Sequence, residues 1–421
     1  MNKIQIKKYI KNVCLKSLKA SRIARTLSNK DRVKILNIII KNLKLNSSNI
    51  IKKNSIDITA AQKNNLSNSL VDRLLINHER ILSMIDGLAK IKTIPDVLFN
   101  KINKSKQPSG ITVEQMRVPL GVIAMIYESR PNVTIDAAGL AIKSANSIIL
   151  RGGSEAINSN MILSKIIKDS LIECNISTDL VQIIKTTDRY AVSELLKMDE
   201  YIDVIIPRGG KGLIKRISEE SKIPLIKHLD GNCHVYVDKE ADFSTAINCT
   251  LNSKTQRYGV CNAAESLIFH QGYPKSYIKK ILEELHRNEV EIRGCRKTKN
   301  IFNQVILAKE SDWYEEYLQP IISVKIVKNI DEAIEHIEKY GSQHTDSIIT
   351  KNKSAQEKFL RSVNSSSVMV NTSTRFADGY EYGLGAEIGI STDKIHARGP
   401  VGLEGLTNLK YIVNSKGVIK N

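Results

Sequence analysis

The sequence predicts an α/β protein built on parallel sheets. From residue 111 onward, short β-rich runs alternate with helical segments, which is the order typical of parallel strand–helix–strand units. A strand, an Arg-Gly-Gly run and a helix follow one another twice, at Arg151-Gly152-Gly153 and at Arg208-Gly209-Gly210. The chain has 421 residues, of which 42% are hydrophobic and 25% charged. This composition is ordinary for a globular protein, and the length suits roughly two or three domains.

The first hundred residues predict mainly helix. Ser28 and Asp31 have the spacing of a capping box, and Leu36, Ile39, Ile40 and Leu43 follow at helical spacing. Apolar residues from 70 to 85 predict one further helix. Pro95 and the stretch 105–110 break the helical pattern.

The remaining elements follow from changes in hydrophobic period. Residues 112–118 alternate like an exposed strand, and 121–127 form an apolar run typical of a buried strand. Further strands are expected at 147–150, 201–206, 234–237 and 321–327. Further helices are expected at 136–145, across 162–167, at 211–220 and at 331–339.

The two Arg-Gly-Gly runs suggest phosphate binding. Glycines between a strand and a helix let backbone N–H groups approach a phosphate at the helix N-terminus, and the Arg can add a charge-assisted hydrogen bond. The alternative is that these are ordinary strand-to-helix turns, which favour Gly in any case. Neither run fits G-x-G-x-x-G, so the common dinucleotide fingerprint is absent.

The six cysteines predict reduced thiols. They form no C-x-x-C pair and have no zinc-finger spacing to His, so no metal site is expected. The N-terminal residues lack the apolar core of a signal peptide, and the longest apolar run, 119–127, is too short for a membrane span. A cytoplasmic location is therefore expected.

The formal net charge of +19 raises the question of a nucleic-acid partner. Lysines are spread along the whole chain together with Asn and Ile, and no aromatic-basic stacking motif occurs. This distribution disfavours nucleic-acid binding. A positive field would still attract anionic substrates and cofactors.

Cys261 is the cysteine whose surroundings suggest a nucleophile. It lies in a short run with Gly259 and small residues, four positions after Arg257 and just before an apolar run at 267–269. A thiol in a turn near a cation can act as a thiolate. The alternative is that Cys261 is a small buried hydrophobe.

Four runs together resemble the proline-pathway branch of the aldehyde dehydrogenase superfamily. They are Arg117–Ile123, Tyr127-Glu128-Ser129-Arg130-Pro131-Asn132-Val133-Thr134, the run around Cys261, and Ser373–Phe376 with His396–Pro400. The resemblance extends over nearly the whole chain and is most specific in the Tyr127–Thr134 run. It implies NADPH-dependent reduction of L-glutamyl 5-phosphate to L-glutamate 5-semialdehyde, with release of phosphate.

The resemblance implies roles for two catalytic residues. The Cys261 thiolate would attack the acyl phosphate and form a thioester. The side-chain amide of Asn132 and the backbone N–H of Cys261 would stabilise the oxyanion. Taken by itself, Asn132 would be only a turn residue after Pro131.

The resemblance also implies cofactor and substrate contacts. Arg151 would suit the 2′-phosphate of NADP, Gly209 and Gly210 would lie by the pyrophosphate, and Glu316 would hold the nicotinamide ribose. The alternative for Glu316 is a solvated carboxylate at a helix end. Arg257 and Arg375 are candidates for the substrate carboxylate or phosphate, with structural ion pairs as the alternative.

One departure from the superfamily is informative. Hydrolytic aldehyde dehydrogenases carry a general-base Glu about thirty residues before the nucleophile, whereas the corresponding run here, Lys227–His234, has no Glu. Without a base that activates water, phosphate rather than water is the expected acyl partner. His228 and Asp230 stay open as proton-transfer groups.

The expected architecture is that of an aldehyde dehydrogenase. Residues 1–236 would form the NADP-binding domain, interrupted near 111–122 by a flap strand. Residues 237–385 would form the catalytic domain. Residues 386–421 would return to the cofactor domain and the flap, through which the chain is expected to form a homo-oligomer.

Two rival functions stay open from the sequence. A CoA-acylating aldehyde dehydrogenase would share the thioester chemistry, and a basic nucleic-acid-binding protein would account for the charge. A separate glutamate 5-kinase is the expected functional partner, because this chain shows no kinase domain.

Overall fold

The computed structural model describes residues 1–420, and the chain folds into two units. Unit 1 comprises residues 1–227, 384–389 and 401–421, and unit 2 comprises residues 228–383 and 390–400. The sequence divided the chain at 236/237 and 385/386, near two of these boundaries. The roles of the two domains stay predictions.

Unit 1 contains nine α-helices and two separate sheets among its described residues. The helices are α1 (Lys3–Ala24), α2 (Asn29–Leu45), α3 (Ser47–Lys63), α4 (Asn68–Leu74), α5 (His78–Thr93), α6 (Val133–Lys143), α7 (Ile157–Glu173), α8 (Tyr190–Leu195) and α9 (Lys211–Glu220). The strands are β1 (Lys101–Lys106), β2 (Thr112–Pro119), β3 (Val122–Tyr127), β4 (Ser147–Gly152), β5 (Val181–Ile183), β6 (Val204–Arg208) and β16 (Thr407–Asn414). Short 3-10 turns occur at η1 (Ser154–Ala156), η2 (Thr178–Leu180) and η5 (Glu404–Leu406).

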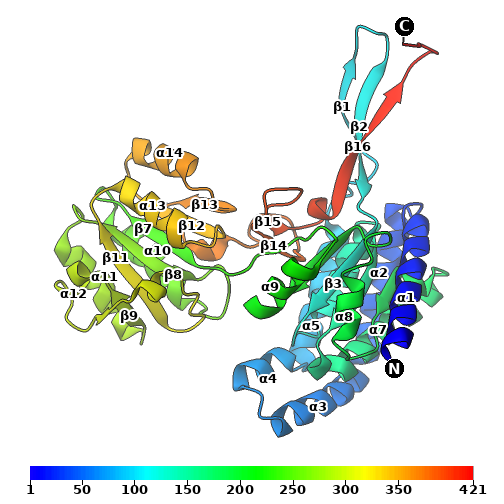
Figure 1. Cartoon of the computed structure of the whole chain (residues 1–421), viewed down its shortest axis with the longest axis horizontal. Coiled ribbons are helices and arrows are strands. Elements are labelled where there is room, and N and C mark those ends of the chain that lie inside the picture. The colour runs from blue at the N-terminus through cyan, green and yellow to red at the C-terminus, as the bar shows by residue number, and fades with distance from the viewer. Residues whose placement is uncertain (421) are drawn as a thin grey trace. The chain divides into compact units, whose positions relative to one another are not determined.

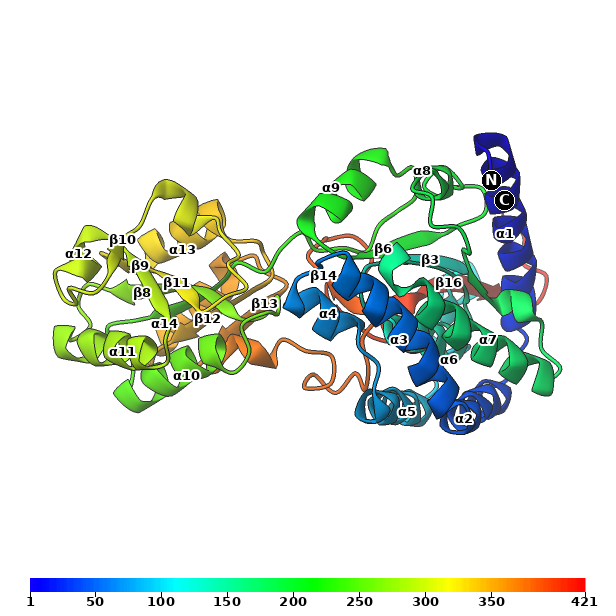
Figure 2. The same cartoon turned by 90° about the horizontal axis from the view of Figure 1, so that it is seen from below.

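The central sheet of unit 1 is parallel, with strand order β5-β4-β3-β6. β3 is buried at every position, as its continuous apolar run requires in a sheet covered on both faces. Helices α1, α8 and α9 bury apolar side chains against one face of this sheet. Helices α2, α5, α6 and α7 form a second helical layer (Figure 2).

Three antiparallel strands of unit 1 form an arm, in the order β1-β2-β16. Figure 1 shows this arm projecting from the rest of the unit. β16 pairs with β2 along its whole length, from Thr407 opposite Pro119 to Asn414 opposite Thr112. The C-terminal strand therefore lies against the strand at residues 112–119.

Unit 2 is a parallel α/β sandwich around one seven-stranded sheet, in the order β10-β9-β11-β8-β7-β12-β13. Its strands are β7 (Cys233–Val237), β8 (Ala264–His270), β9 (Glu291–Gly294), β10 (Ile306–Leu307), β11 (Ile321–Val327), β12 (Thr345–Ile349) and β13 (Ser367–Val370). Its helices are α10 (Phe243–Thr255), α11 (Lys275–Arg287), α12 (Arg296–Lys299), α13 (Ile330–Tyr340) and α14 (Lys353–Ser362), with 3-10 turns η3 (Glu310–Trp313) and η4 (Thr374–Phe376). Two short strands, β14 (Gly389–Ser391) and β15 (Gly399–Val401), pair with each other.

Alternating side chains of the unit 2 strands fill two cores. Leu267 and Phe269 of β8 pack with α10 and α11, whereas Ile268 packs with α13 and α14. This is the two-residue period of a strand covered on both faces. The prediction of an α/β protein with parallel sheets is thereby confirmed.

Several element predictions are correct, and three need correction. The Ser28 capping box is present, and the helix at 211–220 and the strand at 321–327 have the expected bounds. The single helix expected over 70–85 is wrong, because the backbone is extended at Leu75 and α5 starts anew after its N-cap Asn77. The sequence also missed β1, whose residues are all exposed and carry no apolar alternation.

The third correction concerns the strand expected at 201–206. Hydrogen bonds from Tyr201 and Ile202 to Met198 form a helical turn there, and the strand runs from Val204 to Arg208. Arg208 is therefore the last residue of β6, and Arg151 likewise lies within β4. In both Arg-Gly-Gly runs the Arg belongs to the strand.

No helix among residues 1–420 combines the length and the apolar character that crossing a membrane requires.

Candidate active site

Cys261 lies in a loop that joins α10 to β8 in the middle of the unit 2 sheet. α10 begins at its N-cap Asp242, whose carboxylate accepts from the Thr245 N–H at 3.0 Å. The loop is anchored by Asn262, which donates to the carbonyl of Ala377 at 3.0 Å and accepts from Thr374 Oγ1 through its backbone oxygen at 2.7 Å. The thiol is half-buried, so it is held in place and remains accessible.

Gly231 allows the backbone around Cys261 to pack tightly. A Cβ atom at Gly231 would lie 1.9 Å from the carbonyl oxygen of Cys261, a distance that no side chain can occupy. The N–H of Gly231 donates to Glu316 Oε1 at 2.8 Å. Glu316 lies half-buried in the coil between η3 and β11, and its role stays a prediction.

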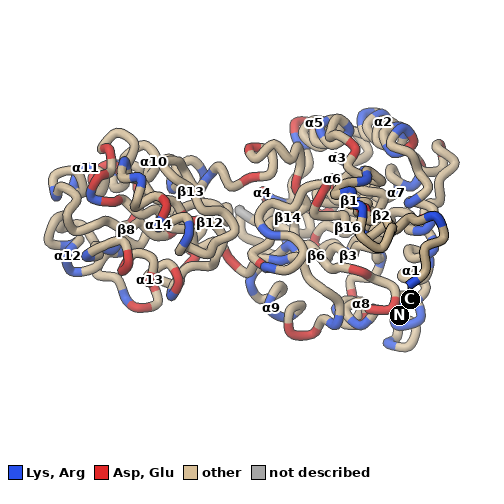
Figure 3. The backbone as a smooth tube through the Cα atoms, turned by 90° about the horizontal axis from the view of Figure 1, so that it is seen from above, with Lys and Arg blue, Asp and Glu red and all other residues tan. Residues whose placement is uncertain are grey.

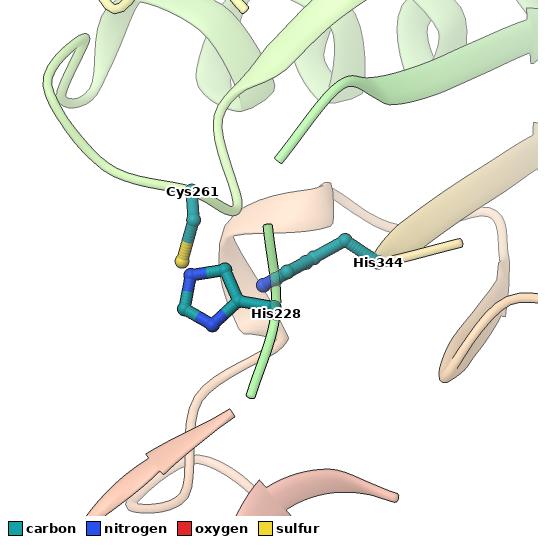
Figure 4. A group of neighbouring side chains, drawn as sticks. All are labelled: His228, Cys261 and His344. Carbon is teal, nitrogen blue, oxygen red and sulfur yellow. The ribbon is translucent and has the colours of Figure 1, made fainter. Parts of the chain in front are cut away.

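Two imidazoles face the Cys261 thiol (Figure 4). The sulfur and one nitrogen each of His228 and His344 all lie within 4.8 Å of one another. The two rings meet edge to face, with centroids 5.5 Å apart. His228 Nδ1 lies 3.1 Å from the carbonyl oxygen of Ile390. Because a carbonyl can only accept, Nδ1 carries the proton and Nε2 keeps a lone pair.

Arg257 and Arg375 lie in the same region as the thiol. Arg375 is half-buried in η4, and its Nε donates to Gln256 Oε1 at 2.9 Å. Burial lowers the pKa of Arg375, the charge of Arg257 lowers it further, and Cys261 and Asp378 raise it. Arg375 therefore lies within electrostatic range of both Arg257 and Cys261, and guanidinium groups in such a position suit a doubly charged phosphate.

A buried ion pair braces the two ends of the Cys261 loop. Lys254, in the last turn of α10, bonds to Glu265 at the start of β8, and both side chains are fully buried. Glu265 also accepts from the Leu318 N–H at 3.1 Å. Burial raises the pKa of Glu265 to about 7, against the opposing effect of Lys254. No sequence signal indicates this pair, because neither residue belongs to a recognisable motif.

In unit 1, both Arg-Gly-Gly runs lie at the carboxyl edge of the central sheet. Tyr127 at the end of β3 stands opposite Gly152 of β4 and Arg208 of β6. The carboxyl edge of a parallel sheet is where α/β proteins bind nucleotides. The N–H of Gly210, at the N-terminus of α9, donates to Glu128 Oε2 at 2.9 Å.

Arg151 is buried at this edge, and only some of its N–H groups have a hydrogen-bond partner within residues 1–420. Its Nη1 donates to the Gly152 carbonyl at 2.7 Å and its Nη2 to the Thr187 carbonyl at 3.1 Å. Its Nε has no hydrogen-bond partner among the described residues. Burial lowers the pKa of Arg151, and Glu155 opposes that shift.

Asn132 also belongs to unit 1, just before α6. Its side-chain amide donates to Asp136 Oδ2 at 3.0 Å. Burial raises the pKa of Asp136 to about 6. The role of Asn132 in stabilising an oxyanion stays a prediction.

Nothing in the sequence marks His344 as a neighbour of Cys261, and the sequence leaves the role of His228 open. His344 is buried one residue before β12, and its Nδ1 lies 2.8 Å from Thr345 Oγ1. The three side chains come from separate segments of the chain, so no local motif could have brought them together.

Comparison with known proteins agrees with the fold. The family model "Aldehyde dehydrogenase family" matches residues 5–301. A crystal structure of gamma-glutamyl phosphate reductase from Thermotoga maritima is 42% identical, covers 98% of this chain and 100% of its own, and has a TM-score of 0.96. The Saccharomyces cerevisiae gamma-glutamyl phosphate reductase is 32% identical over 97% of this chain and 98% of its own, with a TM-score of 0.54.

An acetylating aldehyde dehydrogenase from Geobacillus thermoglucosidasius shares the fold at 18% identity, with coverage of 100% and 98% and a TM-score of 0.71. The chain therefore belongs to the aldehyde dehydrogenase family, in its gamma-glutamyl phosphate reductase branch. It is an oxidoreductase of a family that uses NAD or NADP.

Proposed function

We propose that this chain reduces L-glutamyl 5-phosphate to L-glutamate 5-semialdehyde with NADPH and releases phosphate, the second step of proline biosynthesis from glutamate. The observation that carries the proposal is the similarity to a gamma-glutamyl phosphate reductase over 98% of the chain. The accessible thiol of Cys261, beside two imidazoles and two guanidinium groups, supports it.

Cys261 and its neighbours would carry out the acyl transfer. His228 Nε2, with its lone pair, would take the thiol proton. The sulfur would then bond to the acyl carbon while the carbon–oxygen bond to phosphate breaks, leaving a thioester and free phosphate. Arg257 and Arg375 would hold the phosphate or the substrate carboxylate. After reduction, the carbon–sulfur bond breaks, which releases the aldehyde and restores the thiol.

The carboxyl edge of the unit 1 sheet fits a phosphorylated nicotinamide cofactor. A carboxylate already accepts from the Gly210 N–H, so an anion is suited to this helix terminus, and Arg151 Nε is buried without a partner among the described residues. Arg151 would hold the 2′-phosphate, and Gly209 and Gly210 the pyrophosphate. Glu316 and Asn132 are assigned from the family pattern, to the nicotinamide ribose and the oxyanion. When bound, NADPH supplies the hydride.

The absence of a general-base Glu in the Lys227–His234 run supports reduction over hydrolysis. No residue there matches the base that activates water in hydrolytic relatives. The thioester therefore persists until it is reduced.

The deciding experiment is the reverse reaction with glutamate semialdehyde, phosphate and NADP⁺. Wild type should form NADPH only when phosphate is present, and Cys261→Ser should form none. Cys295→Ser, which changes another half-buried thiol of unit 2, is the matched control. Phosphate-independent NADPH formation, or full activity of Cys261→Ser, would contradict the proposal. CoA replacing phosphate as the acceptor would favour the CoA-acylating rival.

Arg375→Gln tests the anion site in the same assay. Loss of a charge-assisted contact should raise the KM for phosphate by about tenfold or more. Arg361→Gln, on α14, is the control and should leave the KM unchanged. Equal KM values for the two variants would contradict a role of Arg375 in phosphate binding.

We also propose a cytoplasmic homo-oligomer that receives its unstable substrate from a separate glutamate 5-kinase. The exposed arm supports the oligomer.

The charge distribution does not favour nucleic-acid binding. Figure 3 shows Lys and Arg interspersed with Asp and Glu in both units. A salt-sensitive gel shift at physiological ionic strength would favour nucleic-acid binding instead.

A further inference from the structure

The side chains of Cys261, His228 and His344 have the composition of a transition-metal site. One thiol and two imidazoles converge within 4.8 Å from three segments of unit 2 (Figure 4). Thiolate and imidazole are the ligands that Zn²⁺ prefers, whereas Mg²⁺ and Ca²⁺ prefer oxygen. Three protein ligands with one open position form the pattern of an accessible zinc site.

Hydrogen-bonding groups hold one ring nitrogen of each imidazole. His228 Nδ1 donates to the carbonyl of Ile390, and His344 Nδ1 lies beside Thr345 Oγ1. A histidine that binds a metal commonly uses one ring nitrogen while the other is held by a carbonyl or hydroxyl group. The contacts of Nδ1 therefore direct the Nε2 atom of each ring to the space in front of the sulfur.

The geometry requires little adjustment. Zn–S bonds of about 2.3 Å and Zn–N bonds of about 2.0 Å place tetrahedral ligand atoms roughly 3.5 Å apart. Rotations of the half-buried Cys261 and His228 side chains that move their ligand atoms by about an ångström would bring these atoms to this spacing.

We propose that Cys261, His228 and His344 bind Zn²⁺ and that the bound ion reversibly inhibits the enzyme. The thiol proton would pass to solvent, and the ion would bond to the thiolate that otherwise attacks the acyl carbon. The bound sulfur would then be shielded from alkylation. Metal binding does not depend on the proposed function, whereas inhibition of acyl transfer does.

The binding test uses Co²⁺ as a spectroscopic probe of the full chain. One equivalent should produce a thiolate-to-cobalt charge-transfer band that Zn²⁺ abolishes and Mg²⁺ does not. Cys261→Ser should lack the band. His228→Gln and His344→Ala should weaken Zn²⁺ affinity by at least about tenfold. His286→Ala, an exposed histidine on α11, is the matched control and should bind like wild type.

The functional test measures activity and thiol labelling in parallel. Zn²⁺ should inhibit the reverse reaction, a chelator should restore it, and Zn²⁺ should slow iodoacetamide labelling of Cys261 but not of Cys295. Because His344 is buried, circular dichroism must show that His344→Ala is folded, and the half-buried His228→Gln provides the second test. Unchanged Zn²⁺ affinity in both folded His variants, or labelling of Cys261 unaffected by Zn²⁺, would overturn the proposal. Inactivity in the presence of chelator would instead count against the proposed function.

Discussion

At the scale of single residues, the placement of the thiol depends on a glycine that is distant in sequence. Gly231 precedes β7, whereas Cys261 precedes β8, and the parallel pairing of these two strands brings their preceding loops together. The missing side chain at Gly231 leaves room for the Cys261 carbonyl. The conformation of the loop that carries Cys261 is therefore set partly by another loop.

Gly231→Ala should impair both stability and activity. The added methyl would displace the Cys261 backbone, and such overpacking typically costs about 1–3 kcal/mol. Urea unfolding and the reverse assay measure the two effects. Gly259→Ala is the control, because a Cβ there meets nothing within 4 Å among the described residues. Equal effects of the two substitutions would refute this account of Gly231.

At the scale of elements, the Lys254–Glu265 pair joins the end of α10 to the start of β8. Both charges are fully buried, so each depends on the other for compensation. The pair thus fixes the span that the Cys261 loop must bridge.

Glu265→Gln should destabilise the protein by about 3–5 kcal/mol, because it leaves the Lys254 charge buried without a partner. The double variant Lys254→Met with Glu265→Gln should recover much of that loss. Asp169→Asn, which breaks the exposed Lys165–Asp169 pair, should cost less than about 1 kcal/mol. Urea unfolding of wild type, Glu265→Gln, Lys254→Met, the double variant and Asp169→Asn forms the test. Additive effects of the two buried substitutions would contradict the coupling.

Helix α13 carries a buried histidine that the fold keeps neutral. His336 packs against Trp313 and Tyr340, and its Nδ1 lies 3.0 Å from Lys325 Nζ. The Lys ammonium can only donate, so Nδ1 accepts and carries no proton. Burial, together with the smaller effects of the charges of His234, Lys325 and Lys339, lowers the pKa of His336 to about 2.

His336 should make the protein less stable in mild acid. The histidine titrates near pH 6.5 in the unfolded chain and at about pH 2 in the folded chain. Between these pH values the unfolded chain binds a proton that the folded chain does not, so the free energy of unfolding falls as the pH falls. As the pH falls from 7.5 to 5, this histidine lowers the free energy of unfolding by about 2 kcal/mol. His336→Gln should reduce the acid loss in urea unfolding by that amount, whereas the exposed control His286→Gln should not. The same pH dependence in all three proteins would exclude His336 as its source.

At the scale of the whole molecule, the arm leaves apolar surface exposed. β1 and β16 each pair only with β2 among the described residues, so both outer edges of the arm are open. Ile102, Tyr411 and Val413 are 39%, 70% and 56% exposed. Open edges and apolar side chains favour pairing with another chain.

Tyr411→Asp with Val413→Asp should shift the protein from oligomer to monomer, because each substitution would place a charge in the proposed interface. Light scattering after size-exclusion chromatography measures the mass. Leu82→Asp, at a 61% exposed position on α5 outside the arm, should leave the oligomer intact. A monomeric wild type, or an oligomer that survives the double substitution, would contradict the role of the arm.

The sequence by itself determined the fold class, the order of most elements and the family. Hydrophobic period and capping are local properties, so α9 and β11 could be placed from the residues alone. The break between α4 and α5 could not, because its apolar pattern continues through Leu75, where the backbone changes direction.

The tertiary structure alone decided which groups surround the thiol. Gly231, His228 and His344 reach Cys261 because the parallel sheet brings the loops before β7, β8 and β12 to one edge. Contacts between strands distant in the chain leave no periodic trace in the sequence. The sequence could therefore suggest Cys261 as the nucleophile by resemblance, whereas the two imidazoles beside its sulfur follow only from the folded sheet.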